Sequence, residues 1–282
     1  MSHWHFRVNN NREEISMNFL RRWVITFLKA TNFDFSIKHH WADQSRLHLN
    51  SFLHKGYWWN GKNREADEMA AIAKLVKSGD DLLEVGGHIG YLTLYFKHLV
   101  GDSGTVVVFE PGEGNLKYLE KNIEPFENVR LDKRAVSNRV GEATFFIENF
   151  SGQNNSLLSD YAVFQKNLDV AGVSGETRPV TVKTTSLDEF IKTACTTPQF
   201  IKIDVEGAEE LVVDGMQDIL TEVRPVIMIE TVDEHLKTLR KISSHNYVIL
   251  NAELKKADRF EDGKYANSFC IPEEKYSQMN LE

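Results

Sequence analysis

Residues 82–111 read LLEVGGHIGYLTLYFKHLVGDSGTVVVFEP, and this stretch decides the fold. It begins with the short apolar run Leu82–Val85 and continues through a turn whose glycines permit a tight bend and close backbone approach. Tyr91–Val100 has the length and composition of a buried helix, and Gly101 ends it. The β-branched run Thr105–Phe109 predicts a second, parallel strand. The stretch therefore predicts a strand, helix and strand unit of an α/β sheet.

The second strand carries Glu110 to its carboxyl end, where open α/β sheets bind their ligands. Glu110 lies 20 residues beyond Gly90, the separation expected of an acid that holds the hydroxyls of a ribose. The alternative interpretation is a purely structural unit with a glycine-rich turn and a solvated Glu110. Acids at both strand ends, Glu84 and Glu110, favour the ligand site.

The register of the glycines indicates which nucleoside ligand is meant. A dinucleotide fingerprint G-x-G-x-x-G ending at Gly90 requires glycine at position 85, which is Val85 here. The turn instead reads acid-x-Gly-x-x-x-Gly, with Glu84, Gly86 and Gly90 as its fixed points. An acid there suits a cationic ligand such as S-adenosylmethionine, whose carboxylate can still use backbone N–H groups near the helix start. The turn thus favours S-adenosylmethionine over NAD.

Composition favours a soluble enzyme of ordinary size. The 282 residues are 41% hydrophobic and 11% aromatic, which is ample material for a core. The formal charge of −8 argues against a nucleic-acid partner, because such binding rests on clustered Lys and Arg. Two cysteines without a CxxC motif favour a reducing cytoplasm. The apolar patch Trp23–Leu28 is too short to span a bilayer, so we expect no integral membrane segment. An oligomer is compatible with all of this.

The organisation of the chain changes near Gly61. Residues 1–60 are rich in His, Trp, Phe and Asn, with a helix expected over Asn18–Ala30 and no clear alternation afterwards. We interpret them as an N-terminal extension or cap, and residues 61–282 as the main domain. The polar stretch Gly152–Arg178 is interpreted as a loop or lid over a site.

Beyond the first unit, strands continue to alternate with helices, as in a doubly wound, mainly parallel sheet. Ser186 and Glu189 form a capping box for the helix Leu187–Thr193. The other expected helices are Ala66–Lys77, Ala208–Leu220 and Glu234–Ser243. The other expected strands are residues 128–131, 135–136, 143–147, Val180–Thr184, Phe200–Val205, Pro225–Glu230 and Tyr247–Leu250.

A second informative stretch is FIKIDVEGAEE, residues 200–210. With a strand period of two, Lys202, Asp204 and Glu206 project from one face, where three charges are costly to bury without partners or a function. Asp204 and Glu206 lie nearest the carboxyl end of this strand, and Glu230 ends the neighbouring one. The alternative is a buried ion pair that only fixes strand register.

The chain resembles the FkbM-type S-adenosylmethionine-dependent methyltransferases over residues 54–272. The motifs that carry the resemblance are LEVGGHIGY, VVVFEP, Ala135–Val136, the SLL of residues 156–158, the TSLDEF of residues 185–190, and KIDVEGAE. The family's first motif usually opens with Asp and runs Gly-Ala-Asn, where this chain has Glu84, Gly87 and His88.

The resemblance implies a Rossmann-like class I methyltransferase fold: a seven-stranded, mostly parallel sheet whose last strand, Ser268–Pro272, is antiparallel. It also implies O-methylation of a hydroxyl, often on a sugar or glycosylated natural product, so we expect a small-molecule or glycan acceptor. The candidate cofactor-binding residues are Glu84, Gly86, Gly87, His88, Gly90, Glu110, Pro111, Arg134, Ala135 and Asp204.

Methyl transfer to a hydroxyl needs alignment of two reactants and removal of a proton. The candidate catalytic residues are Asp204, Glu206, Glu230 and His88. The same carboxylates are also candidate ligands for Mg²⁺ or Mn²⁺, and residues 57–59 (Tyr-Trp-Trp) are candidates for stacking on a sugar. Two other functions stay open: a nucleotide-sugar or NAD-dependent enzyme on a related scaffold, and a non-catalytic binding module.

Overall fold

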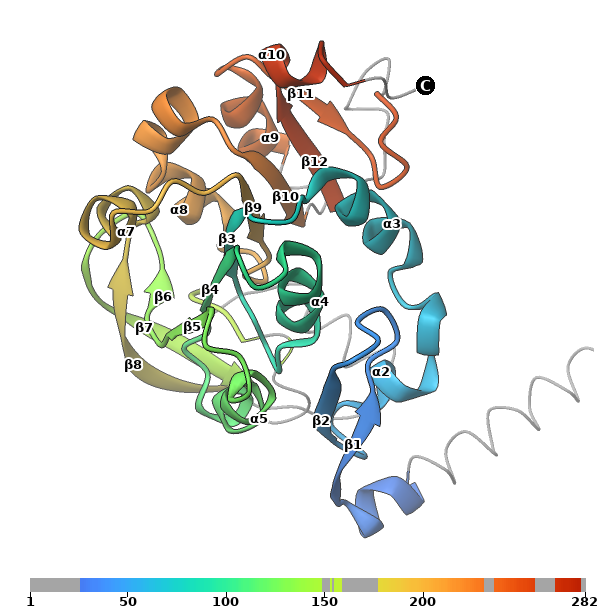
Figure 1. Cartoon of the computed structure of the whole chain (residues 1–282). Helices are drawn as coiled ribbons and strands as arrows, with labels where there is room; N and C mark the ends of the chain where they lie inside the picture. Colours follow the sequence, from blue (N-terminus) through green and yellow to red (C-terminus); the bar gives the residue numbers. More distant parts are fainter. Residues whose placement is uncertain are drawn as a thin grey trace, which may run out of the picture.

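The computed structural model describes residues 26–148, 153, 155–158, 177–230, 236–256 and 267–279. Its main sheet has seven strands in the order β11-β12-β10-β9-β3-β4-β5 (Figure 1). β12 is antiparallel to both β10 and β11, and the other pairs are parallel. This confirms the doubly wound sheet and its antiparallel last strand. The strands are β3 Asp81–Val85, β4 Thr105–Phe109, β5 Val129–Asp132, β9 Phe200–Ile203, β10 Val226–Glu230, β11 Tyr247–Leu250 and β12 Asn267–Pro272.

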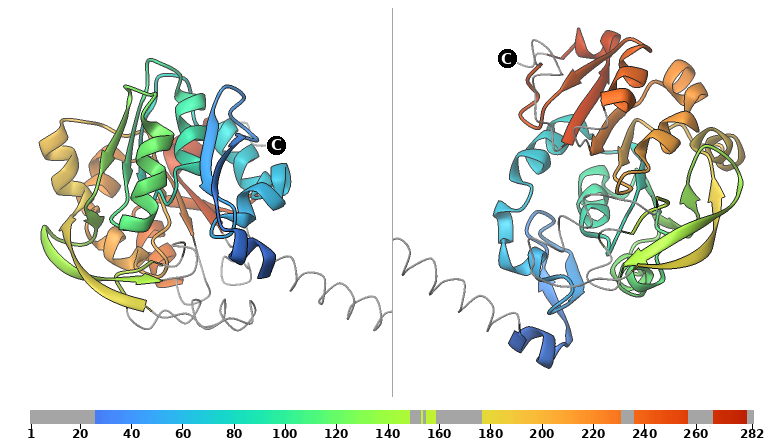
Figure 2. Two further views of the ribbon diagram at one scale, coloured as in Figure 1. Left: turned by 90° about the horizontal axis from the view of Figure 1, so that it is seen from below. Right: turned by 180° about the vertical axis from the view of Figure 1, so that it is seen from behind.

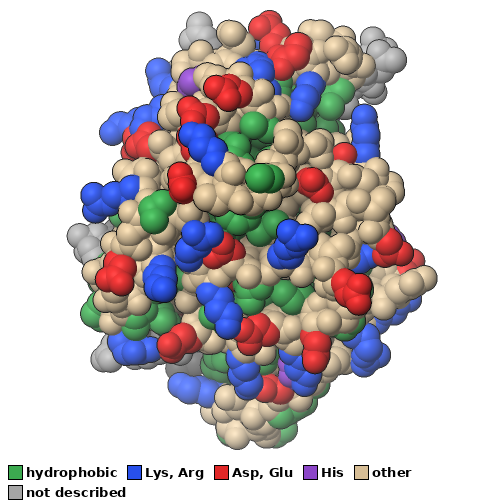
Figure 3. All heavy atoms as spheres, turned by 60° about the vertical axis from the view of Figure 1, so that its left-hand side comes forward, with side chains coloured by type: hydrophobic (Ala, Val, Ile, Leu, Met, Phe, Trp, Pro, Cys, Tyr) green, Lys and Arg blue, Asp and Glu red, His purple; other side chains and the backbone are tan. Residues whose placement is uncertain are grey.

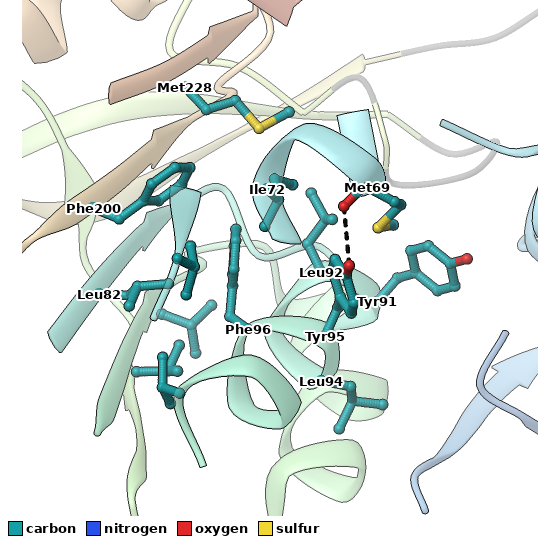
Figure 4. Packing of buried hydrophobic residues seen from close by; sticks show 14 of the residues in the cluster. Met69, Ile72, Leu82, Tyr91, Leu92, Leu94, Tyr95, Phe96, Phe200 and Met228 are labelled. Atoms are coloured by element: carbon teal, nitrogen blue, oxygen red, sulfur yellow. Dashed lines mark hydrogen bonds between the residues drawn. The ribbon is translucent and has the colours of Figure 1, made fainter. Parts of the chain in front are cut away.

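Helices cover both faces of this sheet because successive apolar residues of each strand point to opposite sides. In β3, Leu82 joins the core beneath α3, α4 and α5, whereas Leu83 joins the core beneath α7, α8 and α9. Figure 4 shows the first core, where Phe96 of α4 packs on Phe200 of β9. The helices are α3 Ala66–Leu75, α4 Tyr91–Val100, α5 Glu113–Ile123, α7 Leu187–Ala194, α8 Glu209–Asp214 and α9 Leu236–Ser243, with the short α10 Glu273–Tyr276 after β12.

The N-terminal segment contains a β-hairpin that the sequence did not predict. β1 Asp34–Lys38 pairs antiparallel with β2 Arg46–Asn50, and α2 Lys55–Trp59 and a 3₁₀ turn, Gly61–Asn63, follow. The alternation Leu47–His48–Leu49 is too short to stand out, yet both leucines are fully buried in the core beneath α3 and α4. Of the expected helix Asn18–Ala30, residues 26–30 are helical and the rest lie outside the described residues. The division at residue 60 stays a prediction.

A smaller sheet, of order β6-β8-β7, lies beyond β5. It consists of β6 Ala135–Val136, β7 Gly141–Glu148 and β8 Thr177–Thr185. β8 begins earlier than expected, so Thr177 and Arg178 belong to a strand and not to the loop; of that loop only residues 153 and 155–158 are otherwise described. All views in Figures 1 and 2 place this sheet and the β1–β2 hairpin on opposite flanks of the molecule.

Several expected element bounds are corrected by the structure. The strand from Phe200 ends at Ile203, and the helix expected over Ala208–Leu220 divides at Gly215 into α8 and a π-helical turn, Ile219–Val223. A Cβ at Gly215 would lie 2.3 Å from the carbonyl oxygen of Ser137, so this position is held by tertiary packing. The N-cap half of the expected capping box is present, since Ser186 Oγ accepts from the Glu189 N–H at 3.3 Å. In the described part of the chain, no helix is long and apolar enough to cross a bilayer.

Candidate active site

A cavity of about 630 Å³ lies at the carboxyl ends of β9, β3, β4 and β5, within the size range of small-molecule sites. It brings together most of the residues proposed from the sequence: Gly86, His88, Glu110, Pro111, Arg134, Ala135, Asp204, Glu206 and Glu230. The N-terminal segment adds residues that the sequence did not single out: Leu53, Lys55, Gly56, Arg64 and Glu65. Of residues 57–59, only Tyr57 is among the described lining residues; Trp59 is 65% exposed elsewhere.

The glycine turn brings two backbone segments into direct contact. A Cβ on Gly86 would lie 1.8 Å from the carbonyl oxygen of Asp204, and one on Gly87 would lie 2.1 Å from Val108 Cγ2. Gly86 also has a φ of +85°, a conformation that other residues rarely adopt. Gly86 lines the cavity, whereas Gly87 and Gly90 lie outside its described lining. Gly86 is therefore required where the turn meets the backbone of Asp204 at the cavity wall.

Glu84 lies behind this turn and not in the cavity. Its side chain is 1% exposed and accepts a hydrogen bond from Thr93 Oγ1 at 2.5 Å. Burial raises the pKa of Glu84 to about 7, although the nearby Lys202 opposes that rise. The sequence had placed this carboxylate against the ligand, but its hydrogen bond to α4 turns it into the core. Its prediction as a direct cofactor contact is not supported by this geometry.

Glu110 is buried at the end of β4, which excludes the alternative of a solvated side chain. Its Oε2 accepts from the His88 N–H at 2.8 Å, while Oε1 accepts from the Gly112 N–H at 2.8 Å and from Asn115 Nδ2 at 3.2 Å. Burial raises the pKa of Glu110 to about 7 against the effect of these hydrogen bonds. The three donors fix the carboxylate at the cavity wall. Asn115 was missed because its place in the first turn of α5 carries no motif.

His88 connects the glycine turn to the N-terminal segment. Its Nδ1 lies 2.9 Å from the hydroxyl of Tyr57, and the two rings stack at 5.8 Å. The His88 backbone has a φ of +48°, which aims the ring toward α2 while its N–H is bonded to Glu110. Burial raises the pKa of Tyr57 to about 12, so this phenol stays neutral. His88, where the turn differs from the usual family motif, therefore has a hydrogen-bond partner in Tyr57.

Lys202 joins the turn to the acidic side of the cavity. Its side chain is almost fully buried, donates to the Gly86 carbonyl oxygen at 2.6 Å and lies 3.1 Å from Asp204 Oδ2. Burial acts to lower the pKa of Lys202, but Asp204 and Glu84 hold it above its ordinary value. The ion pair considered as the alternative thus exists. Asp204 nevertheless faces the cavity, so pairing and a role in the site coexist.

Asp204, Glu206 and Glu230 each offer an oxygen within 4.8 Å of the others. The sequence argument placed Asp204 and Glu206 on one face of a continuous strand, and this is wrong. The strand ends at Ile203, and Glu206 takes a left-handed backbone conformation, with φ +55°. Burial and the neighbouring carboxylates raise the pKa of Glu230 to about 10, and Glu230 is hydrogen-bonded to Asp204. The Glu230 carboxyl therefore holds its proton to a higher pH than an exposed glutamate does. Three carboxylates also form a donor set that suits Mg²⁺ or Mn²⁺.

At the opposite end of the cavity, Arg134 is fixed by Asp132 at the end of β5. Arg134 Nε donates to Asp132 Oδ1 at 2.9 Å and Nη2 donates to Oδ2 at 2.5 Å. Beside it the wall is apolar, formed by Ala135, Val136 and Phe145. The cavity thus grades from carboxylates at β9 to an apolar wall beyond β5.

Comparisons with known proteins agree on the kind of protein. A family model described as the methyltransferase FkbM domain matches residues 84–249. A protein of Beauveria bassiana (strain ARSEF 2860) named Methyltransferase 1 is 26% identical over 153 residues, which cover 49% of this chain. The match spans 58% of the length of that curated relative.

Solved structures give weaker similarities. Methyltransferase FkbM from Methylobacillus flagellatus KT superposes with a TM-score of 0.45 at 12% identity, over 76% of this chain and 60% of the other. Fibrillarin from Aeropyrum pernix, solved with natively bound S-adenosyl-L-methionine, superposes with a TM-score of 0.44 at 10% identity, over 84% and 87% of the two chains.

Proposed function

The chain belongs to the FkbM family of S-adenosylmethionine-dependent methyltransferases, and from this premise we propose that it methylates a hydroxyl of a sugar, glycan or glycosylated metabolite. The observation that carries the proposal is the row of strand ends along the cavity. Strand pairing sets Ile203 beside Val85, Val85 beside Phe109, and Phe109 beside Asp132. The residues that follow these strands therefore stand in one line, from Asp204 to Ala135, along which an elongated ligand can lie.

The middle and apolar end of this row suit the cofactor. Glu110 would hold the ribose hydroxyls, because its carboxylate is fixed at the cavity wall by three donors. Gly86 lines the cavity where the sulfonium would lie, and Ala135, Val136 and Phe145 would pack on the base. Pro111 and Arg134 would border the ribose and base. The bound cofactor supplies an electrophilic methyl group; the residues named here hold and orient it.

The acidic end of the row suits the acceptor. Lys202 fixes Asp204, and Glu230, when protonated, can donate a hydrogen bond to it. We assign the removal of the hydroxyl proton to Asp204 or Glu206, because both lie in the cavity next to the turn. Glu230 would act as a donor that orients this group, and His88, whose Nδ1 is bonded to Tyr57, would shape the boundary between the two halves.

A second version of this chemistry uses a divalent cation. The carboxylates of Asp204, Glu206 and Glu230 match the oxygen ligands that Mg²⁺ or Mn²⁺ prefers, and such an ion lowers the pKa of a bound hydroxyl. Lys202 already places a positive charge 3.1 Å from Asp204, which opposes a cation there. The base version is therefore favoured.

The acceptor class rests on the amide side chains of the cavity. Gln153, Asn155 and Asn267 line it, and Asn267 is the strand partner of Glu230 at the acidic end. Amides both donate and accept hydrogen bonds, as hydroxyl-rich ligands require. On the face shown in Figure 3, Lys and Arg are interspersed with Asp and Glu. This face therefore lacks the continuous basic surface that nucleic-acid binding needs. Cytoplasmic location and oligomeric state stay predictions.

Isothermal titration calorimetry with S-adenosylmethionine and with NAD tests the cofactor assignment. We expect binding of the first only; binding of NAD alone would favour a dehydrogenase. A screen of sugars and glycosides by mass spectrometry then tests the acceptor, with a mass gain of one methylene as the expected result. Methylation of a protein or a non-glycosylated molecule, with no sugar product, would contradict the acceptor class. Cofactor binding without any turnover would favour a binding module.

A further inference from the structure

The dipeptide Arg64–Glu65 places opposite charges side by side in the cavity. The Arg64 and Glu65 side chains are 23% and 31% exposed, and Arg64 Nη2 lies 2.8 Å from Glu65 Oε1. Both residues line the cavity, although they come from the segment before α3 and not from a strand end. Neither residue belongs to a motif that the sequence shows. The cavity wall therefore presents a guanidinium and a carboxylate next to each other.

Arg64 packs on an aromatic ring, and one of its hydrogen-bond donors has no partner among the described residues. Its guanidinium carbon lies 4.4 Å from the centre of the Tyr57 ring, which in turn packs at 4.9 Å on Tyr91. Arg64 Nε is buried and has no hydrogen-bond partner among the described residues, and the same holds for the Tyr91 hydroxyl. Figure 4 shows the Tyr91 side chain, which belongs to the same core, pointing away from Phe96. A buried donor without a partner costs free energy unless a ligand satisfies it.

Glu65 is held in a strained backbone conformation. Its φ of +53° lies in the left-handed region, which is unfavourable for a residue with a side chain. Strain of this kind is concentrated at functional sites, where surrounding contacts over-determine the geometry. At the same time Glu65 closes the first turn of α3, because its carbonyl oxygen accepts from the Met69 N–H at 2.9 Å. Glu65 is thus held as the N-cap residue of α3.

The position of this pair along the cavity is given by its charged neighbours. Arg64 interacts electrostatically with Asp204, and Glu65 with Asp204 and Lys202, so both lie toward the β9 side of the glycine turn. Glu110 lies on the other side of that turn, at β4. With the ribose at Glu110, the amino-acid end of the cofactor would fall beside Arg64 and Glu65.

The groups that the sequence assigned to this end are already engaged. Glu84 is bonded to Thr93 behind the turn. Four backbone N–H groups of the turn before α4 donate within the protein: Gly86 and Gly87 to Phe109, His88 to Glu110, and Gly90 to Gly87. A cation and an anion from another segment would therefore complete the recognition of an α-amino acid group.

We infer that Arg64 binds the carboxylate and Glu65 the ammonium of the methionyl end of the cofactor. The inference rests on the proposed function for the identity of the ligand. A guanidinium forms two parallel hydrogen bonds with a carboxylate, and an unpartnered Nε is one of the two donors of that fork. In the free protein Arg64 and Glu65 pair with each other. When the ligand binds, Arg64 pairs with its carboxylate and Glu65 with its ammonium.

The test measures the affinity of the full chain for S-adenosylhomocysteine and for two truncated analogues, one lacking the carboxylate and one lacking the amino group. Titration calorimetry on the unmodified chain should give about ten- to a hundredfold weaker binding of each analogue. In Arg64→Gln, the penalty for losing the carboxylate should vanish and the penalty for losing the amino group should remain. In Glu65→Gln the pattern should be reversed.

Lys62→Gln and Asp67→Asn are matched controls, because each removes one exposed charge next to the pair; both should keep both penalties. Arg64→Lys keeps the charge without the fork and should give an intermediate penalty. Discrimination against the carboxylate-free analogue that persists in Arg64→Gln would overturn the assignment. So would an unmodified chain that binds all three ligands within about threefold. Failure of the unmodified chain to bind S-adenosylhomocysteine at all would instead overturn the proposed function, and this inference with it.

Discussion

The hydroxyl of Tyr57 lies 2.9 Å from Nδ1 of His88, across 31 residues of sequence. This hydrogen bond ties α2, from the N-terminal segment, to the glycine turn. The backbone N–H of His88 donates in turn to Glu110 at 2.8 Å. The N-terminal segment thus reaches the proposed ribose-binding carboxylate through two consecutive hydrogen bonds.

Tyr57→Phe should weaken binding of S-adenosylmethionine about three- to tenfold, because it removes one neutral hydrogen bond that orients the turn. Titration calorimetry measures this effect. Tyr95→Phe is the matched control: its hydroxyl donates to the Met69 carbonyl oxygen at 2.9 Å inside the core, so it should lower stability and leave affinity unchanged. Equal affinity losses in both variants would contradict a specific role for Tyr57.

Glu110→Ala should lower affinity for S-adenosylmethionine about ten- to a hundredfold, since it removes charge-assisted hydrogen bonds to the ribose. Glu113→Gln, an exposed change in the following helix, should bind as the unmodified chain does. Calorimetry on both variants decides the matter, and unchanged affinity in Glu110→Ala would remove Glu110 from the cofactor site.

Asp204→Asn and Glu206→Gln should separate catalysis from binding. If either residue accepts the hydroxyl proton, its replacement should lower kcat about 10²- to 10⁴-fold with cofactor affinity close to that of the unmodified chain. Asp214→Asn, at the far end of α8, serves as control. Full activity in both site variants, with an acceptor in hand, would show that neither is the base.

Glu230→Gln should change how stability depends on pH. With a pKa raised to about 10, Glu230 keeps its proton in the folded chain at pH values where it loses it on unfolding. Its contribution to stability is therefore greatest below its ordinary pKa of 4.5 and is lost as the pH rises toward 10. The variant lacks this loss, so its stability relative to the unmodified chain should rise from pH 5 to pH 9, by at most about 1.4 kcal/mol per pH unit. Urea unfolding at several pH values measures this, and parallel curves would mean that Glu230 is not perturbed.

Chelation separates the two versions of the chemistry. Because Lys202 already lies 3.1 Å from Asp204, we expect activity to survive EDTA. Loss of activity that Mg²⁺ or Mn²⁺ restores would establish the metal version instead. Dialysis against buffer with and without the chelator, followed by one activity assay, distinguishes these outcomes.

The sheet could be predicted because its evidence is local. Alternating or continuous apolar runs mark each strand, and the glycine turn fixes where the first strand meets its helix. The details of the acidic cluster could not, because the left-handed backbone at Glu206 breaks the period of two on which the sequence argument relied. The hairpin at Leu47 and Leu49 was missed for a related reason: its pattern is only a few residues long.

Arg64 and Glu65 carried no signal at all. Their place in the cavity depends on how the segment before α3 packs on Tyr57 and Tyr91, which spacing along the chain does not encode. Glu84 shows the opposite case. Its position in the motif was correctly noticed, but its hydrogen bond to Thr93 turns the carboxylate away from the cavity.

The contacts of residues 53–65 with later parts of the chain constrain the order in which the cavity forms during synthesis. Residues 48–65 are synthesised before the groups that they contact: Asn122 bonds both the N–H and the carbonyl oxygen of His48, and His88 meets Tyr57. Because chains fold from the N-terminus as they are synthesised, residues 53–65 can pack on the sheet only after its first strands and their helices have been synthesised. The cavity wall formed by residues 53–65 is therefore completed only after the glycine turn and α5 have been synthesised.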